Sequence, residues 1–192
     1  MIAILKYNAG NATSVKNAVE RLNFSCTITD DAGQLKSAEK VIFPGVGEAG
    51  TAMRYLNKTG LDEVILSLKQ PVLGICLGQQ LLCSNTEEGN TTGLGIFKAR
   101  VKKFPPLDLV PQMGWNSIYE LKTHLFKNVR ENSDVYFVHS YYAERTEETI
   151  ACCNYILPFS AAMQKDNFYA TQFHPEKSAG IGNQILKNFL EL

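Results

Sequence analysis

The sequence has no apolar run long enough to cross a bilayer and no excess of charge of either sign. Its 192 residues include 19 Lys and Arg and 19 Asp and Glu, so the formal net charge is zero. A membrane-spanning helix needs about 18 consecutive apolar residues, and residues 1–7 are too short and too β-like for a signal peptide. We therefore expect neither a membrane protein nor a protein that binds nucleic acid.

Cysteine and histidine are also scarce, with five Cys and three His in the chain. The cysteines form an odd and scattered set, which excludes a disulfide framework and points to a reducing, cytoplasmic environment. Cys152 and Cys153 are adjacent, and no His lies three or four residues from another His or Cys, so the spacing of a zinc site is missing. We expect no metal ion and no other cofactor.

Internal repeats, low-complexity tracts and flexible linkers are missing as well, so we expect one domain over residues 1–192. In the first half, short apolar strands alternate with helical segments, a pattern typical of right-handed βαβ crossovers. This alternation predicts an α/β fold with a mostly parallel central sheet flanked by helices. The expected strands are residues 2–7, 25–29, 40–43 and 71–75, with a turn at 30–33 closing the second. The expected helices are one that Asn11 or Thr13 could cap and two more at 48–57 and 60–69.

After Asn85 the pattern changes to short segments rich in aromatic and β-branched residues. We expect these to be antiparallel strands that extend or cover the sheet, with a hairpin turn at Asp166 and Asn167. An amphipathic helix over residues 178–191 closes the chain. The expected strands of this half are residues 94–103, 114–120, 134–143, 148–156, 159–165 and 167–173.

The clearest chemical signal is the sequence Gly-Ile-Cys-Leu-Gly at residues 74–78, between an apolar run and a Gln-rich segment. Strand, sharp turn and helix in this order match the G-x-S-x-G nucleophile elbow, with sulfur in place of oxygen. The Cys76 sulfur then lies at a helix N-terminus, where unpaired N–H groups and the helix dipole favour the thiolate. The alternative interpretation is a buried structural cysteine on a core strand.

A cysteine nucleophile needs a general base close to it in space. His124 lies in an expected exposed turn or short helix, and His139 lies inside an aromatic strand, where a hydrogen-bonded core histidine is the simpler interpretation. His174 follows a strand and begins His-Pro-Glu. Pro175 holds His174 in an extended backbone, and Glu176 can accept a hydrogen bond from the far ring nitrogen. An N-terminal helix cap is the alternative interpretation of this segment.

Residues 74–80, Gly-Ile-Cys-Leu-Gly-Gln-Gln, and residues 173–178, Phe-His-Pro-Glu-Lys-Ser, resemble the class I (triad) glutamine amidotransferases in sequence, order and separation. The resemblance runs the length of the chain. It implies a flavodoxin-like fold and the hydrolysis of glutamine to glutamate and ammonia through a cysteine thioester. It also implies that Cys76 is the nucleophile, His174 the general base and acid, and Glu176 the residue that orients His174.

The same resemblance implies further roles around the nucleophile. The oxyanion of the reaction would be held by the N–H of Leu77 and by one from the turn that contains Val46 and Gly47. Glu88 can pair with the ammonium group of the substrate, although its segment is also typical of a solvated loop. The implied substrate-binding residues are Gln80, Glu88, Ser140 and Tyr141, the last two mainly through backbone groups.

Three more segments, residues 44–47, 111–116 and 136–141, are similar to the glutaminase subunits of imidazole glycerol phosphate synthase, an enzyme of histidine biosynthesis. In those subunits the second segment more often begins Pro-His, whereas Gln112 stands at the second position here. The similarity implies a heterodimer with a cyclase subunit of (β/α)₈-barrel fold, which receives ammonia through an internal channel. The implied partner interface comprises Trp115, Asn116, Tyr136 and Lys177.

Two other functions stay open at this point. A glutaminase with the same chemistry could serve a different synthase, and Gln112 keeps that alternative in view. A non-catalytic protein of the same fold could use Cys76 as a redox sensor, but a sensor has no need for the His-Pro-Glu unit.

We also derive a hypothesis on regulation from the glycine-rich turn at residues 44–47. In the free subunit this turn would point a carbonyl, rather than an N–H, at the oxyanion position. It would flip when the partner is loaded, and Gly45 and Gly47 make such a flip sterically cheap.

Overall fold

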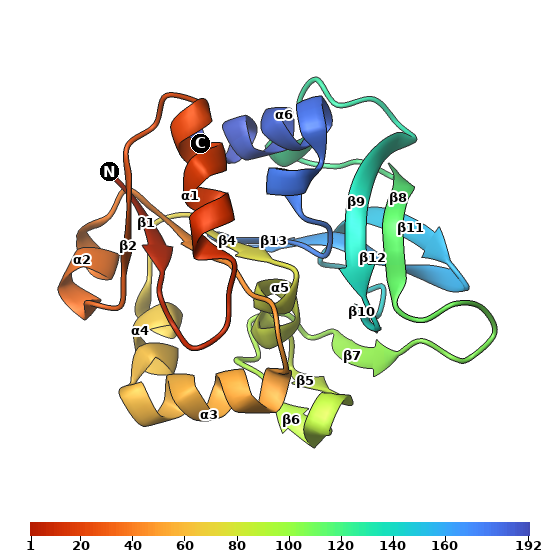
Figure 1. Cartoon of the computed structure of the whole chain (residues 1–192), viewed down its shortest axis with the longest axis horizontal. Coiled ribbons are helices and arrows are strands. Elements are labelled where there is room, and N and C mark those ends of the chain that lie inside the picture. Colours follow the sequence, from red (N-terminus) through yellow and green to blue (C-terminus); the bar gives the residue numbers. More distant parts are fainter.

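The computed structural model describes residues 1–192 and contains one large and one small sheet, with helices on both faces of the large one (Figure 1). Neighbouring strands of the large sheet run parallel from β2 to β13 and antiparallel from β13 to β9. The predicted α/β class and its antiparallel C-terminal strands are confirmed. The strand order is β2 (Cys26–Thr29), β1 (Ile2–Leu5), β3 (Lys40–Phe43), β4 (Val72–Ile75), β13 (Phe168–Thr171), β12 (Leu157–Lys165), β11 (Thr149–Tyr155), β8 (Gln112–Tyr119) and β9 (Ser133–His139).

The helices form two layers because successive residues of each parallel strand point to opposite faces. Ile4 of β1 packs in a core with side chains of α1 (Ala12–Arg21) and α6 (Ala179–Leu190). Leu5 packs on the other face, with side chains of α2 (Ala32–Ser37), α3 (Ala49–Thr59), α4 (Leu61–Ser67) and α5 (Leu77–Leu82). Figure 1 shows α1 and α6 on one side of the sheet and α3 and α4 on the other. None of these helices is both long enough and apolar enough to span a membrane.

The small sheet has the order β10 (Tyr141–Ala143), β7 (Arg100–Lys103), β5 (Asn85–Thr86) and β6 (Thr91–Thr92). Only the end of the expected strand 94–103 is a strand. The N–H groups of Leu94, Gly95 and Phe97 instead donate to carbonyl oxygens at the end of α5, which a helix leaves without partners. The short 3-10 helices η1 (Glu88–Asn90), η2 (His124–Phe126) and η3 (Pro175–Lys177) complete the fold.

Two further local predictions were wrong, and one was confirmed. The expected turn at residues 30–33 begins α2, because the Asp31 side chain accepts a hydrogen bond from the Gln34 N–H at 2.7 Å and caps the helix. The expected strand 134–143 is broken at Ser140 into β9 and β10. The hairpin turn at Asp166 and Asn167 is present between β12 and β13.

The large sheet curls so that its last strand returns to the carboxyl end of β13. Tyr136 of β9 accepts a hydrogen bond from the His174 N–H at 3.0 Å, although four strand pairings separate β9 from β13 in the sheet order. The Tyr136 N–H donates to the Ser178 hydroxyl at 2.9 Å. The antiparallel strands therefore fold over the end of the parallel sheet, where ligands bind in open α/β folds.

Candidate active site

The segment 74–78 forms the sharp turn that its glycines predict. Cys76 lies between β4 and α5 with φ 54° and ψ −106°, a strained backbone conformation for a residue with a Cβ. A Cβ on Gly78 would lie 2.0 Å from the Phe43 carbonyl oxygen, so only glycine lets α5 approach β3 this closely. The Cys76 N–H donates to the Thr171 carbonyl oxygen at 2.7 Å. The cysteine is thereby fixed at the carboxyl ends of β4 and β13.

His174 and Glu176 form a buried pair next to this cysteine. The Nδ1 atom of His174 is 2.8 Å from Glu176 Oε1, and Nε2 is buried without a hydrogen-bond partner. Burial by itself lowers the pKa of His174, but the neighbouring Cys76 and Glu176 outweigh burial and raise this pKa to about 10. At neutral pH the His174 ring is therefore the imidazolium, which lies between the Glu176 carboxylate and the Cys76 sulfur.

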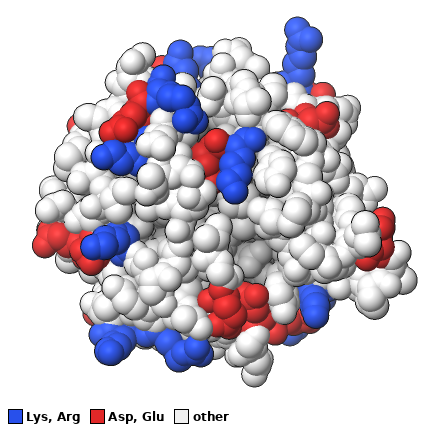
Figure 2. Space-filling model, in the orientation of Figure 1, with Lys and Arg blue, Asp and Glu red and all other residues white.

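Cys76 opens into a cavity of about 280 Å³, and Figure 2 shows a hollow in this face of the molecule. Every residue predicted for the oxyanion hole or for substrate binding lines this cavity. Val138 and His139, which the sequence did not predict to line the substrate site, line it too. The complete lining is Val46, Gly47, Cys76, Leu77, Gln80, Glu88, Val138, His139, Ser140 and Tyr141.

The cavity has an acidic side near the start of α3. Glu88 is half-buried there and accepts a hydrogen bond from the Ala49 N–H at 2.8 Å, while burial raises the pKa of its carboxyl group. Burial and then the charges of Glu88, Glu87 and Glu48 raise the pKa of Tyr141. Figure 2 shows acidic side chains gathered beside the hollow. This negative field suits a ligand with a cationic group.

The predicted oxyanion donor is occupied in this structure. The Leu77 N–H donates to the Gly45 carbonyl oxygen at 3.3 Å, so the turn at 44–47 presents a carbonyl to the elbow. The Tyr7 hydroxyl donates to the Pro44 carbonyl oxygen at 2.7 Å and holds the turn in place. Gly47 has φ +115°, a conformation that favours glycine.

Backbone hydrogen bonds restrict what Ser140 and Tyr141 can offer a ligand. The Ser140 carbonyl accepts from the Phe104 N–H at 3.0 Å. The Tyr141 carbonyl accepts from Gln80 Nε2 at 3.1 Å and from His139 Nδ1 at 2.7 Å. Since both carbonyl groups are occupied, the N–H groups of this segment are the ones suited to contact a ligand carboxylate.

Gln112 points inward and reaches the cavity wall through His139. Its side-chain amide is 3.0 Å from His139 Nε2, and both residues are buried. Burial lowers the pKa of His139 to about 4, so its ring is neutral and carries one N–H. Nδ1 of this ring faces the Tyr141 carbonyl oxygen at 2.7 Å, and Nε2 faces Gln112 Oε1 at 3.0 Å, so both ring nitrogens lie against oxygen atoms. His139 is thus the hydrogen-bonded core histidine of the simpler interpretation.

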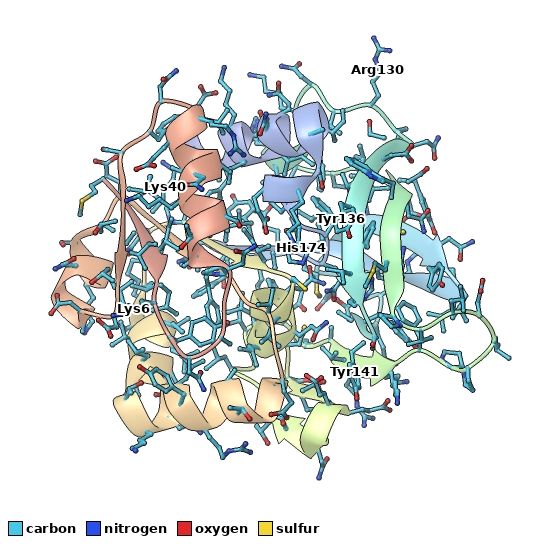
Figure 3. All side chains as sticks on the ribbon, in the orientation of Figure 1. Lys6, Lys40, Arg130, Tyr136, Tyr141 and His174 are labelled. Carbon is cyan, nitrogen blue, oxygen red and sulfur yellow. The ribbon has the colours of Figure 1, made fainter.

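The four residues predicted for a partner interface lie on β8, β9 and η3. Trp115 is 55% exposed, and its ring centroid is 6.0 Å from that of Tyr136. Lys177 Nζ lies 6.0 Å from the centroid of the same Tyr136 ring. The Asn116 side chain instead donates to the Asn154 carbonyl oxygen at 3.1 Å. Figure 3 shows Tyr136 next to His174, so this surface borders the buried His174–Glu176 pair.

Sequence reasoning missed two residues that contact the elbow and its turn. Tyr7, two residues after the end of β1, donates to the Pro44 carbonyl, and Gln172, two residues before His174, contacts the Cys76 sulfur at 3.6 Å. Their positions in the sequence could have indicated them, because both residues follow parallel strands whose carboxyl ends meet at the site.

Comparisons with known proteins show the family of the chain. The chain matches the family described as Glutamine amidotransferase class-I over residues 5–192. It is 57% identical over 194 residues to a Bacteroides fragilis (strain YCH46) protein named Imidazole glycerol phosphate synthase subunit HisH, covering 100% of this chain and 99% of that protein. A Pasteurella multocida protein of the same name is 46% identical over 192 residues, covering 99% of this chain and 97% of that protein.

Solved structures share the fold at low sequence identity. A crystal structure of a glutamine amidotransferase superposes with a TM-score of 0.75 at 18% identity, covering 99% of this chain and 97% of that one. PurLQS from Thermotoga maritima gives a TM-score of 0.72 at 16% identity, with coverage of 99% and 97%.

Proposed function

Because the chain belongs to the class I glutamine amidotransferase family, we propose that it is the glutaminase subunit of an imidazole glycerol phosphate synthase. It hydrolyses glutamine and passes the ammonia to a cyclase subunit of (β/α)₈-barrel fold in the cytoplasm, for histidine biosynthesis. The observation that carries the proposal is the full-length identity with two HisH subunits. The position of Cys76 beside the His174–Glu176 pair supplies the chemistry.

The reaction begins when Cys76 Sγ attacks the side-chain amide carbon of glutamine. A C–S bond forms and negative charge develops on the amide oxygen. The N–H of Leu77 and one from the turn at Val46 and Gly47 hold this oxyanion once the turn has released Leu77 from the Gly45 carbonyl. Covalent catalysis replaces the high barrier of amide hydrolysis by two lower ones.

His174 moves the protons of both steps. Its raised pKa provides an imidazolium, whose Nε2 proton goes to the leaving nitrogen, so that ammonia departs and a γ-glutamyl thioester remains. The neutral ring then takes a proton from water, and the resulting hydroxide adds to the thioester carbonyl. Glutamate leaves, Cys76 returns to the thiolate and His174 to the imidazolium. Glu176 keeps Nδ1 occupied, so that Nε2 faces the reaction.

The charged and polar groups of the cavity determine how glutamine is oriented. The Glu88 carboxylate on the acidic side pairs with the ammonium group of glutamine. The donors of Gln80 are bound to the Tyr141 carbonyl and to Gln172, which leaves Gln80 Oε1 as an acceptor for the same ammonium. Backbone N–H groups at Ser140 and Tyr141 receive the α-carboxylate.

Glutamate release from glutamine tests this proposal. The purified chain would be assayed alone and then with the cyclase subunit of the same organism and its nucleotide ligand. We expect little release alone and a large rise with the loaded partner. Release that does not respond to the partner would contradict the assignment to this synthase, and no release in any mixture would contradict the glutaminase itself.

Replacement of Trp115 by alanine is expected to weaken the complex with the cyclase at least about tenfold, because exposed aromatic residues dominate the affinity of many interfaces. The melting temperature of the free chain should not change, since the side chain is half-exposed. Titration with the cyclase subunit measures the dissociation constant. The matched control is Leu66→Ala, a 45% exposed side chain on α4, away from β8 and β9. Equal affinities for wild type and Trp115→Ala would exclude this face as the interface.

Replacement of Gly182 by alanine is expected to damage the His-Pro-Glu turn. A Cβ at Gly182 would lie 2.0 Å from the Pro175 carbonyl oxygen and 2.7 Å from the Ser178 Cβ. Relief of this clash moves η3 away from α6, with a cost of roughly 1–3 kcal/mol in stability and loss of most glutamate release. Gly180→Ala is the control on the same helix, because no atom lies within 4 Å of its added Cβ. Thermal melts and activity assays should separate the two variants, and similar behaviour would contradict the account.

A further inference from the structure

Gln172 occupies a buried position between the nucleophile and the substrate-binding Gln80. Its side chain is fully buried, Nε2 is 3.6 Å from Cys76 Sγ, and Oε1 accepts from Gln80 Nε2 at 3.0 Å. Its backbone N–H donates to the Ala161 carbonyl of β12 at 2.8 Å, which fixes the residue at the end of β13. In the proposed mechanism this side chain only accepts a hydrogen bond from Gln80.

We propose that Gln172 is a catalytic residue whose amide N–H binds the Cys76 sulfur and stabilises it as the thiolate. The proposal deepens the proposed function, since it concerns the nucleophile of the same reaction. A hydrogen bond donated to the charged form of a group favours that form, and donors to charged acceptors contribute more than neutral pairs.

The hydrogen-bond network fixes which end of the Gln172 amide faces the sulfur. The Tyr141 carbonyl can only accept, so Gln80 must present its NH₂ group to it. The second hydrogen of that NH₂ group points to Gln172, which must therefore present its oxygen. Rotating the Gln172 amide would set two donors against each other. The NH₂ group of Gln172 is thus held toward Cys76.

The other groups around the Cys76 sulfur include an acceptor that opposes negative charge, so a donor such as the Gln172 amide helps to stabilise the thiolate. The Val138 carbonyl oxygen lies 3.9 Å from Cys76 Sγ and suits a thiol but opposes a thiolate. Titratable groups that face the sulfur are His174 and Tyr7, and Glu88 lies across the cavity. Burial, followed by the charge of Cys76, raises the pKa of the Tyr7 hydroxyl, so this group stays neutral. Besides the N-terminus of α5, His174 and Gln172 are the groups placed to stabilise negative charge on the sulfur.

The test is the rate at which iodoacetamide alkylates Cys76, followed by mass spectrometry of its peptide from acid to alkaline pH. Gln172→Met keeps the volume of the side chain but removes the donor. Since a hydrogen bond to a charged group is worth about 1.5 kcal/mol or more, labelling at neutral pH should slow at least about tenfold. The pH profile should also move to higher pH, which a merely structural residue would not cause.

Gln79→Met is the matched control for the loss of a buried glutamine. Gln79 is fully buried and donates to the Ser160 carbonyl at 3.0 Å, without contacting Cys76. We expect wild-type labelling for this variant. A folded Gln172→Met protein that labels at the wild-type rate would overturn the proposal.

If Gln172→Met does not fold, Gln80→Met decides the question, because it removes the group that orients the Gln172 amide. A severalfold slower alkylation supports the proposal, and an unchanged rate overturns it. Alkylation needs neither glutamine nor the cyclase subunit. Normal labelling of Gln172→Met in an active glutaminase would therefore count against this inference alone. Slow labelling of Gln172→Met, together with a wild-type chain that releases no glutamate even with the loaded cyclase, would count against the proposed function alone.

Discussion

Replacement of Cys76 by alanine is expected to lower glutamate release by a factor of about 10⁴ or more, the scale on which loss of a nucleophile acts in enzymes with covalent intermediates. The sulfur forms the thioester, and no neighbouring group can take its place. His174 and Glu176 can move protons, but both side chains are buried and paired with each other. The measurement is single-turnover and steady-state release of glutamate, with the loaded cyclase present.

The control for this variant is Cys26→Ala. Cys26 lies on β2, an edge strand separated from β4 by β1 and β3, and its sulfur donates to the Lys16 carbonyl at 3.9 Å, away from the site. It should keep wild-type turnover. Cys76→Ala should still bind glutamine in a calorimetric titration, because the cavity is otherwise unchanged. Substantial glutamate release by Cys76→Ala would show that the nucleophile lies elsewhere.

Replacement of Gly47 by proline is expected to abolish the turnover that the partner stimulates, while glutamine binding stays largely intact. Gly47 has φ +115°, whereas proline fixes φ near about −65° and has no N–H. The variant therefore loses both the freedom of the turn and a donor predicted for the oxyanion. In the present conformation the Leu77 N–H donates to the Gly45 carbonyl of the turn. We therefore expect that stimulation changes the conformation of the turn and frees this N–H for the oxyanion.

Glutamine binding to this variant is best measured on the Cys76→Ala background, where no turnover occurs. Cys76→Ala and Cys76→Ala/Gly47→Pro should bind glutamine with similar affinity. An equal loss of binding and of stimulated turnover would show that the turn shapes the substrate cavity and does not switch the oxyanion donor. Retention of full stimulation by Gly47→Pro would exclude the turn from regulation.

The central features of the site could be predicted from local sequence because their geometry is local. Flanking glycines and the change from an apolar strand to a helix predict the elbow, and Cys76 has the positive φ that such a turn imposes. The spacing of His174 and Glu176 within one short segment allows their 2.8 Å contact. Parallel strands place their carboxyl ends together, which is why distant turns meet at one cavity.

Contacts between distant segments could not be predicted in this way. Gln172 is 96 residues from Cys76, and Gln80 is 92 residues from Gln172, so their hydrogen bonds depend on how β13 pairs with β4. The helix α2 was missed because Asp31 and Gly33 are typical of turns, whereas the Asp31 cap and the burial of Leu35 decide in favour of a helix. The present orientation of the turn at 44–47 likewise depends on Tyr7 and Leu77, which are remote in sequence.

The two halves of the chain make different contributions to the site. The parallel strands hold the elbow, the glycine turn and the His174–Glu176 pair. The antiparallel extension returns through β9, supplies the cavity wall at His139 to Tyr141, and exposes Trp115 and Tyr136 beside that pair. A partner bound on this outer surface would therefore contact the same strands that shape the substrate cavity.

The fate of the amide nitrogen of glutamine tests the central claim most directly. The complex of this chain with its cyclase subunit would receive glutamine labelled with ¹⁵N at the side-chain amide, together with an excess of unlabelled ammonium and the nucleotide substrate. Mass spectrometry of the imidazole product then identifies the source of its nitrogen. The account predicts that ¹⁵N enters the product in preference to the bulk ammonium, and that Cys76→Ala removes the label from it. A product nitrogen drawn from the bulk ammonium, with glutamine left unused by the wild-type complex, would contradict the account.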